Sequence, residues 1–310
     1  MDYVILVITV LAIYGIGAVA LNLAFGLGGI FVVTQAAFLG VGAYAAALLA
    51  KAAPAWGFWP GLLIAAAVAA LLAWVIGIAT LRIRGDAFIV ASLALQIVLV
   101  DVFVNLKDVT GGPYGLSKLP EVLPNRVLYL LLTVAILAGV SLYAHRLTRS
   151  PMGRTLRAIR DDDSAAEMSG KDTVNTRVAV YMVTCALAAV AGGLMGILTK
   201  YIYPGSFGVD LSILMIAMII VGGLGNVWGA LLGALLLGGL PEALRFLPIP
   251  NDNVLTVQRI LYGSALMLVP FWRPRGLFPD SYGRNARVLG TARERPVPSD
   301  GPGSDERALR

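Results

Sequence analysis

The chain has 310 residues, 58% of them hydrophobic and 14% charged, with a mean hydropathy of +0.81. This composition excludes a water-soluble globule, because such a protein would lack the polar side chains that cover its surface. The net charge of +6 would suggest nucleic acid in a soluble protein, but here the cations lie in loops and in the C-terminal tail. We interpret them as topology signals and as attraction to anionic lipid, so we expect the lipid bilayer, and no nucleic acid, as their partner.

Apolar runs long enough to cross a bilayer, about 20 residues each, follow one another along the chain. We expect membrane spans near residues 3–22, 30–50, 60–81, 88–105, 127–145, 178–200, 206–224, 229–246 and 255–272. Backbone groups in lipid must be hydrogen-bonded internally, and runs without period-2 alternation exclude a β-barrel. The sequence therefore predicts an all-α, polytopic helical bundle of about eight to nine spans.

Two parts of the chain differ in composition from these spans. Residues 146–177 form a long charged loop, and residues 281–310 are rich in Pro, Gly, Ser and charge. We expect a transmembrane domain over residues 1–280, which includes the loop, and a disordered cytoplasmic tail over residues 281–310.

The cations predict the direction of the spans. The charged loop carries Arg146, Arg149, Arg154, Arg157, Arg160, Lys171 and Arg177. The positive-inside rule places this loop in the cytoplasm, together with Arg82, Arg84 and the tail. Counting spans from the loop puts the N-terminus outside, the C-terminus inside, and the stretches 51–59, 106–126 and 247–254 on the outer side.

Within the charged loop, the pattern predicts an amphipathic helix over residues 151–160, an acidic turn, and a second short helix that Gly170 ends. Ala165 and Ala166 keep one face of this second helix flat, while the flanking charges hold it in water. Such a loop is typical of a docking surface for a partner protein and not of a catalytic site. We predict contacts to the partner from Arg157, Asp161, Ala165, Ala166, Glu167 and Gly170.

The residues that most catalytic sites need are scarce. His145 and Cys185 are the only histidine and cysteine, so we expect neither a metal cluster nor a Ser-His or Cys-His nucleophile. The chain has no Gly-x-x-x-x-Gly-Lys-Ser/Thr stretch, so another chain must hydrolyse any ATP that drives transport. We therefore expect no bound metal or cofactor and no enzymatic activity.

Small residues recur every four positions in several spans. These sets are Gly61, Ala65, Ala69, Ala73 and Gly77; Ala188, Gly192 and Gly196; and Gly225, Gly229 and Gly233. Such faces let membrane helices approach closely, so we expect internal packing, with a substrate path or a subunit seam as the alternative.

Polar residues within spans are candidates for a substrate path, because burying them without a partner costs several kcal/mol. Gln96 lies deep in its span, where its amide needs either a partner in the bundle or water. Asn22, Thr34 and Gln35 flank an interruption at Gly26–Gly29. An unwound backbone there would present polar groups to a zwitterionic solute, and an ordinary turn is the alternative.

A second interruption involves glycine alone. Gly222 and Gly223 separate two apolar segments that are each barely long enough to cross. Residues 206–228 therefore either cross the bilayer or re-enter it, and the two glycines join the candidates for the substrate path.

Several stretches, taken in order, resemble one known family. Residues 158–170 read Ala-Ile-Arg-Asp-Asp-Asp-Ser-Ala-Ala-Glu-Met-Ser-Gly and look like the coupling loop of bacterial ABC-importer permeases. Stretches that agree elsewhere are Ala20–Leu23, Gly40–Tyr44, Leu81–Asp86, Thr110–Gly115, Pro204–Phe207 and Val221–Asn226. The chain therefore resembles the M-type (LivM) permease subunit of branched-chain amino acid importers.

The resemblance implies the permease subunit of an ATP-binding-cassette importer, which forms the path for branched-chain or other hydrophobic amino acids across the bacterial cytoplasmic membrane. It also implies a second, H-type permease, two cytoplasmic ATPase subunits that carry ATP and Mg²⁺, and an extracytoplasmic solute-binding protein. Gly29–Gln35 departs from the usual family pattern, since it is more apolar and lacks a histidine. Urea, amides or sugars stay open as cargoes, whereas an ion-coupled carrier is disfavoured by the scarcity of ionisable residues within the spans.

Overall fold

The computed structural model describes residues 2–53, 57–83, 85–117, 119–120, 125–244, 251–273 and 276–278. The expected disordered tail lies outside these residues. Among the described residues, Leu116 and Ile202 form an isolated antiparallel β-bridge. In chain order the elements are α1 (Asp2–Asn22), η1 (Leu23–Leu27), α2 (Gln35–Ala52), α3 (Phe58–Thr80), α4 (Asp86–Asn105), α5 (Lys107–Thr110), η2 (Gly112–Tyr114), α6 (Arg126–Arg149), α7 (Pro151–Asp161), α8 (Asp163–Met168), α9 (Thr173–Thr199), η3 (Pro204–Phe207), α10 (Val209–Gly222), α11 (Val227–Leu244) and α12 (Asn251–Trp272).

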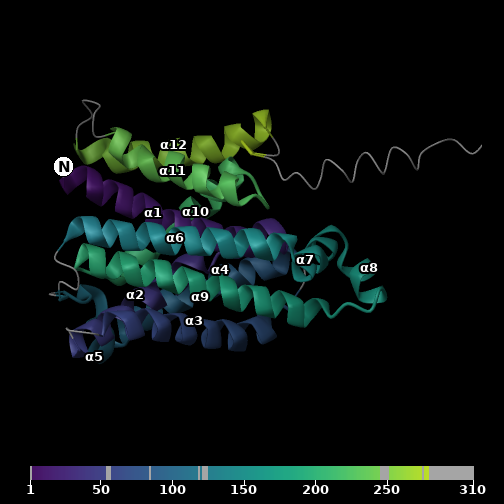
Figure 1. The fold of residues 1–310 in the computed structure, drawn as a ribbon, viewed down its shortest axis with the longest axis horizontal. Coiled ribbons are helices and arrows are strands. Elements are labelled where there is room, and N and C mark those ends of the chain that lie inside the picture. The colour runs from purple at the N-terminus through teal and green to yellow at the C-terminus, as the bar shows by residue number, and fades with distance from the viewer. Residues whose placement is uncertain are drawn as a thin grey trace, which may run out of the picture. The chain divides into compact units, whose positions relative to one another are not determined.

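In the described part of the chain, 8 helical segments are long and apolar enough to cross a membrane (Figure 1). They are Asp2–Leu27, Gln35–Ala52, Phe58–Thr80, Ala87–Asn105, Arg126–Arg149, Thr173–Thr199, Pro204–Gly222 and Val227–Leu244. α12 adds a shorter apolar stretch, Ile260–Val269. The prediction of an all-α, polytopic membrane bundle is confirmed.

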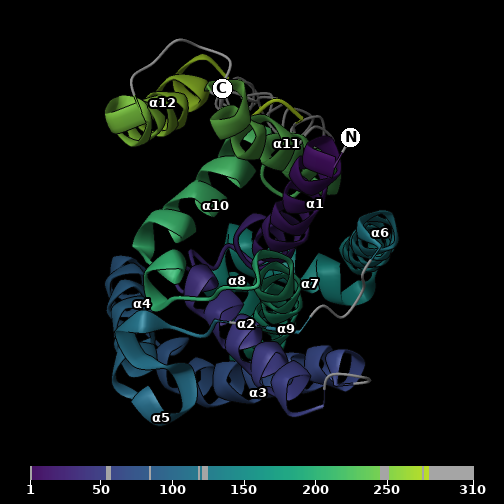
Figure 2. The same ribbon diagram turned by 90° about the vertical axis from the view of Figure 1, so that its left-hand side faces the viewer.

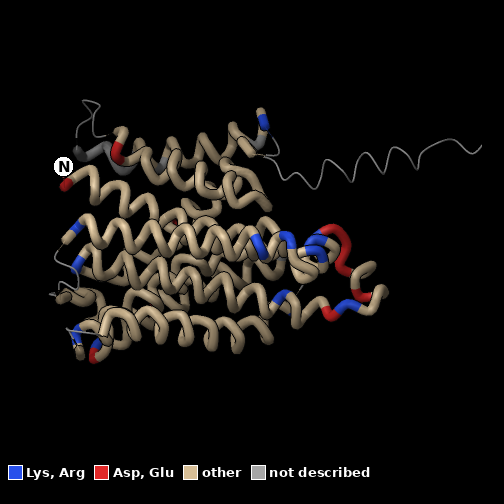
Figure 3. The backbone as a smooth tube through the Cα atoms, in the orientation of Figure 1, with Lys and Arg blue, Asp and Glu red and all other residues tan. Residues whose placement is uncertain are grey.

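The long helices lie side by side, so their connections gather at two ends (Figure 1). α7 and α8 project at one end, whereas the N-terminus and α5 lie at the other. Figure 3 shows that basic residues are concentrated around α7 and the end of α6. We call this the basic end and the other the opposite end.

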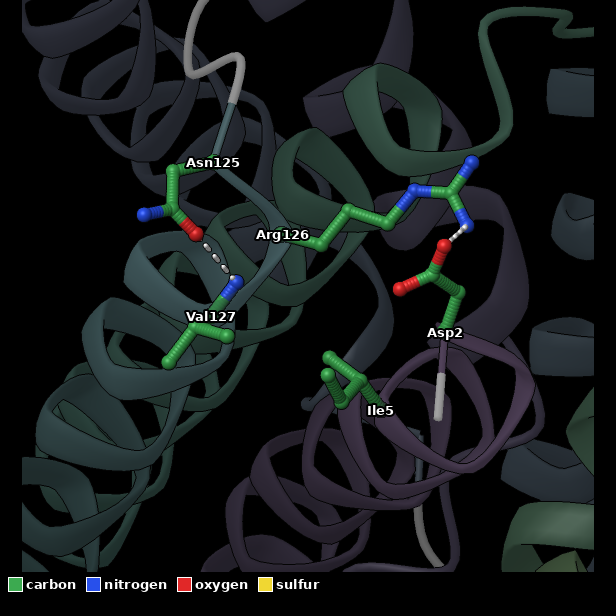
Figure 4. A pocket seen from close by; sticks show the side chains of 5 residues that line it. All are labelled: Asp2, Ile5, Asn125, Arg126 and Val127. Atoms are coloured by element: carbon green, nitrogen blue, oxygen red, sulfur yellow. Dashed lines mark hydrogen bonds and ion pairs between the residues drawn. The ribbon is translucent and has the colours of Figure 1, made fainter.

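An open pocket of about 520 Å³ lies at the opposite end, between the first turns of α1 and α6 (Figure 4). The side chain of Asn125 caps the N-terminus of α6 by accepting a hydrogen bond from the backbone N–H of Val127 at 3.0 Å. Arg126 then pairs with Asp2 at 3.7 Å, although the two side chains are 63% and 76% exposed. Such exposed pairs contribute little stability, so the pocket is a surface junction.

α2 and α9 pack closely at the centre of the bundle, with α3 against both (Figure 2). A Cβ atom on Gly192 would overlap the backbone of Leu39, and one on Gly42 would overlap that of Ala189. On α3, the small residues at four-residue spacing are buried, namely Gly61, Ala65, Ala69, Ala73 and Gly77. Close packing inside the chain therefore accounts for these small-residue faces.

α10 and α11 form a tight hairpin. Gly222 at the end of α10 lies against the backbone of Gly229 in α11, where a side chain would overlap. Gly223 has φ +128°, a conformation that residues with a side chain rarely adopt. The second predicted interruption is thus a turn between packed helices, and Pro204–Gly222 counts among the possible spans.

Two connections inside the bundle are not regular helix. α1 continues into the π-helix η1, and residues 28–34 then run without helix until α2 begins at Gln35. The second span therefore starts later than residue 30, where the sequence placed it, because Gly29 turns the chain with φ +66°. Residues 200–208 likewise contain only η3 before α10 begins. Both connections leave the N-terminus of a helix inside the bundle.

Candidate functional site

At the basic end, residues close together in the sequence stabilise the start of α7. The side chain of Ser150 caps the helix by accepting a hydrogen bond from the N–H of Gly153 at 3.2 Å, and Pro151 occupies the first turn. Leu156 and Ile159 are buried on the face that turns towards the bundle. The predicted amphipathic helix is confirmed.

α8 follows as a second, shorter helix. The carboxylate of Asp162 caps it by accepting a hydrogen bond from the N–H of Ala165 at 3.0 Å. Ala165 is exposed but Ala166 is only 5% exposed, so the prediction that both alanines share one flat face is wrong. Consecutive residues of a helix point in different directions, and a single turn cannot align them. Gly170, with φ +75°, turns the chain after the helix as expected.

Two side-chain contacts hold α8 against the start of α9. Arg177 pairs with Asp163 at 3.1 Å, and both side chains are only 18% exposed. The hydroxyl of Thr173 donates to Glu167 at 2.9 Å. The outer surface of α8 stays open, since Met168 is 88% exposed. These contacts fix a short helix that would be unstable alone.

The residues predicted to contact a partner divide into two groups. Exposed around α8 are Asp161, Ala165, Glu167 and Gly170. Arg157 instead turns back towards α6, donating to the carbonyl of Gly153 at 3.2 Å and to that of Thr148. Arg157 and the buried Ala166 therefore shape the loop, and contact of the exposed group with a partner stays a prediction.

Arg160 connects α7 with the interrupted segment after α1. Its guanidinium group donates to the carbonyl oxygen of Gly26 in η1. The same side chain covers Gly29, where an added Cβ would come within 2.9 Å of Arg160 Cγ. The sequence pattern identified Arg160 only as a topology signal, although its position four residues after the buried Leu156 indicates the inner side of the helix.

Asn22, the last residue of α1, is hydrogen-bonded to the turn between α10 and α11. Its side-chain amide donates to the carbonyl of Asn226 at 3.0 Å, and its side-chain oxygen accepts from the N–H of Gly225 at 2.9 Å. Asn22 is 4% exposed, with both polar atoms satisfied. Direct hydrogen bonds thus link α7 to η1, and the end of α1 to the hairpin.

Side chains from other helices cap the start of α2. The N–H of Ala37 donates to Gln96 Oε1 at 3.0 Å, and the N–H of Ala36 donates to Ser212 Oγ at 3.1 Å. Gln96 Nε2 in turn donates to the carbonyl of Phe207 at 2.7 Å. One amide side chain therefore satisfies polar groups of α2 and η3 at once, as a buried helix terminus requires.

The next two predicted residues lie beside this cap. Thr34 Oγ1 and the hydroxyl of Tyr181 are 3.0 Å apart and hydrogen-bonded. Gln35 Nε2 donates to the carbonyl of Gly17 at 3.3 Å, while Gln35 Oε1 has no partner among the described residues. Both Thr34 and Gln35 are fully buried. They join the start of α2 to α9 and α1.

The residues predicted for the substrate path thus occupy two places. Around the start of α2 lie Thr34, Gln35 and Gln96, and near the hairpin turn lie Asn22, Gly222 and Gly223. In this conformation their hydrogen bonds and close packing hold the chain together, and contact with a solute stays a prediction. Sequence reasoning missed Ser212 and Tyr181, because a single hydroxyl within an apolar span carries no pattern.

A cavity of about 410 Å³ lies beside α8. Its walls come from Gly29–Phe31, from the connection between α3 and α4, and from Asp163, Ser164 and Arg177. Among the described residues, no group of three or more His, Cys, Asp or Glu side chains is placed to hold a metal ion.

The family model described as "Branched-chain amino acid transport system / permease component" matches residues 3–270. The chain belongs to this family. The match spans every long apolar helix of the structure, together with α7 and α8. The chain is therefore a multi-pass membrane protein of a permease family, and its relatives are transport permeases.

Curated relatives cover most of the chain. It is 28% identical to the high-affinity branched-chain amino acid transport system permease protein LivM of Escherichia coli, over 87% of this chain and 69% of that protein. It is 29% identical to the probable branched-chain amino acid transport permease protein LivM of Methanocaldococcus jannaschii, over 71% of this chain and 68% of that one. The probable LivH permease of the same organism is 31% identical over 49% of this chain and 50% of its own length. No solved structure matches the chain.

Proposed function

We propose that this chain is the permease subunit of an ATP-binding-cassette importer and forms the path for branched-chain or other hydrophobic amino acids across the cytoplasmic membrane. The observation that carries the proposal is the family match over residues 3–270, which includes the projecting helices α7 and α8. The names of the relatives supply the cargo class, and urea, amides or sugars are the alternatives.

The basic end faces the cytoplasm in this proposal. Cations around α7 and at the end of α6 support this orientation through the positive-inside rule (Figure 3). The N-terminus then lies outside and the C-terminus inside. α7 and α8 project towards cytoplasmic ATPase subunits, which hold ATP and Mg²⁺, so this chain itself needs no cofactor.

The remaining partners follow from the same assignment. Half of the chain also matches a LivH permease, which supports a second, H-type permease beside this one. Two ATPase subunits and an extracytoplasmic solute-binding protein complete the proposed complex. The bilayer surrounds the apolar helices.

Coupling in the proposed importer passes from α8 to the bundle through named contacts. Motion of an ATPase subunit displaces the exposed surface of α8, which the ion pair of Arg177 with Asp163 fixes to α9. α7 transmits motion through the hydrogen bond of Arg160 to Gly26, and Asn22 links that region to α10 and α11. Rigid-body movement of packed elements between two states is an established way to transmit such motion.

The test reconstitutes the complete importer in proteoliposomes and compares two variants. Ala165→Asp places a charge on the exposed surface of α8, and Val109→Asp places the same charge on exposed α5 at the opposite end. We expect Ala165→Asp to abolish uptake and ATPase stimulation while the protein stays in the membrane, and Val109→Asp to retain both. Normal uptake by Ala165→Asp would contradict the coupling role.

The cargo needs a separate measurement. Calorimetric titration of the cognate solute-binding protein with leucine, urea and a pentose identifies the class of solute that the importer receives. Binding of leucine alone supports the proposal. Binding of only urea or a sugar would replace the amino-acid assignment and leave the importer assignment intact.

A further inference from the structure

The exposed face of α6 ends in two arginines. Along this helix, residues three or four positions apart are exposed and form one stripe, namely Leu131, Ala135, Ala138, Leu142, Arg146 and Arg149. The first four are apolar, so this part of the stripe suits contact with lipid acyl chains. Arg146 and Arg149, here called the arginine pair, follow in the last turn on the same face. An apolar surface thus leads directly to two guanidinium groups at the basic end.

The protein itself leaves these two charges uncompensated. In the part of the chain that the structure describes, neither arginine of the pair takes part in an ion pair. The acidic residues of the charged loop gather around α8, farther from the apolar helices (Figure 3). Cations at the boundary between an apolar helix and water lie at the level of the phospholipid headgroups, and guanidinium groups bind phosphate through paired hydrogen bonds. The stripe therefore fits one phospholipid, with its acyl chains along Leu142 and its headgroup at the arginine pair.

The arginine pair belongs to the same rigid unit as α7. At the elbow between α6 and α7, the hydroxyl of Ser150 donates to the carbonyl of Leu147 at 2.7 Å and accepts from the N–H of Gly153 at 3.2 Å. Arg157 of α7 donates to the carbonyl of Thr148 in α6. A Cβ atom on Gly153 would overlap the carbonyl oxygen of Leu147, so the two helices touch at their backbones. A displacement of α7 is therefore passed to the last turn of α6.

We propose that the arginine pair binds the headgroup of an anionic phospholipid and thereby anchors the elbow between α6 and α7 to the surface of the bilayer. The binding depends only on the membrane location of the bundle, whereas its effect on transport rests on the proposed importer function and deepens it. With the headgroup bound, α7 and α8 pivot about a fixed point when an ATPase subunit displaces them, instead of tilting α6 through the lipid. A zwitterionic headgroup carries its own cation beside the phosphate, so an anionic headgroup is the preferred occupant.

Photocrosslinking in the complete importer tests the site without reference to transport. p-Benzoylphenylalanine replaces Leu142, one turn before Arg146, in proteoliposomes of equal parts phosphatidylglycerol and phosphatidylcholine, and mass spectrometry of the crosslinked peptide identifies the lipid. Each cation near a membrane surface favours anionic lipid, so we expect phosphatidylglycerol to be enriched roughly fivefold for each arginine. Arg146→Gln with Arg149→Gln should abolish the enrichment, whereas Arg146→Lys with Arg149→Lys should retain most of it.

The matched control places the same probe at Leu128, near the other end of α6. Leu128 is 49% exposed and lies two residues after Arg126, whose charge Asp2 compensates. We expect the bulk ratio of the two lipids there. Equal enrichment at both probe positions, or unchanged enrichment in the glutamine variant, would overturn the site. Loss of the enrichment on addition of inorganic phosphate would overturn it too, because the arginines would then bind a free anion and not a lipid.

Uptake tests the anchoring role. Replacing part of the phosphatidylcholine with phosphatidylglycerol should raise leucine uptake by the unaltered importer, and Arg146→Gln with Arg149→Gln should remove this response. Lys107→Gln with Arg126→Gln removes two exposed cations at the opposite end and should keep it. The same response with and without the arginine pair would overturn the anchor and leave the lipid site in place. Absence of leucine uptake from vesicles of every composition would instead overturn the proposed function, while the crosslinking result would stand.

Discussion

The N-termini of α7 and α2 are completed in opposite ways, since Pro151 at the start of α7 is exposed and Gln35 at the start of α2 is fully buried. Ser150 caps α7 from the adjacent position in the chain, whereas Gln96 and Ser212 cap α2 from two other helices. A local cap makes a helix that keeps its structure when it moves as a unit. Distant caps make a helix terminus that depends on the arrangement of its neighbours, so α2 is stable only while α4 and α10 hold their places.

The largest expected effect follows from removing the distant cap. Gln96→Leu leaves the N–H of Ala37 and the carbonyl of Phe207 buried without partners. Each such group costs about 1–3 kcal/mol, so we expect a marked fall in the melting temperature of the detergent-solubilised protein. Gln96→Glu retains an acceptor for Ala37 and should lose less. Equal melting temperatures for Gln96→Leu and the unaltered chain would show that α2 does not depend on this cap.

Arg160→Ala should separate coupling from stability. The substitution removes the hydrogen bond to Gly26 but leaves the buried Leu156 and Ile159 of α7 in place. We expect ATP-driven uptake to fall roughly 2- to 30-fold, the range for residues that modulate coupling, with a nearly unchanged melting temperature. Arg160→Lys keeps a donor and should retain more uptake, and Arg154→Ala, an exposed arginine on the same helix, is the control.

The same contrast explains how far the sequence could predict this molecule. Apolar run length was sufficient for the bundle, and the amphipathic pattern of residues 151–160 was sufficient for α7, because those signals are local. The late start of α2 and the cap by Ser212 were not predictable, since they depend on helices that are distant in sequence. Gln96 was recognised only as an amide in need of a partner, and the structure identified the partner.

A smaller effect is expected at the local cap of α8. Asp162→Ala removes the acceptor for the N–H of Ala165 and should destabilise this helix by about 1 kcal/mol, whereas Asp162→Asn should retain most of the cap. Hydrogen exchange of the α8 amides measures the change directly. Faster exchange confined to α8 is expected, and faster exchange at the start of α2 would contradict the independence of the two sites.

The smallest effect is expected at the opposite end, where Asp2 pairs with Arg126. Both side chains are mostly in water, so solvent and salt screen their attraction, and the entropy of holding the two side chains in one geometry offsets it. Asp2→Asn, Arg126→Gln and the double variant form a cycle whose coupling energy should be close to zero in melting experiments. A large coupling energy would mean that the junction of α1 with α6 in Figure 4 is held as firmly as the buried start of α2. The expected difference in stability between the exposed pair of Asp2 with Arg126 and the buried, capped start of α2 would then disappear.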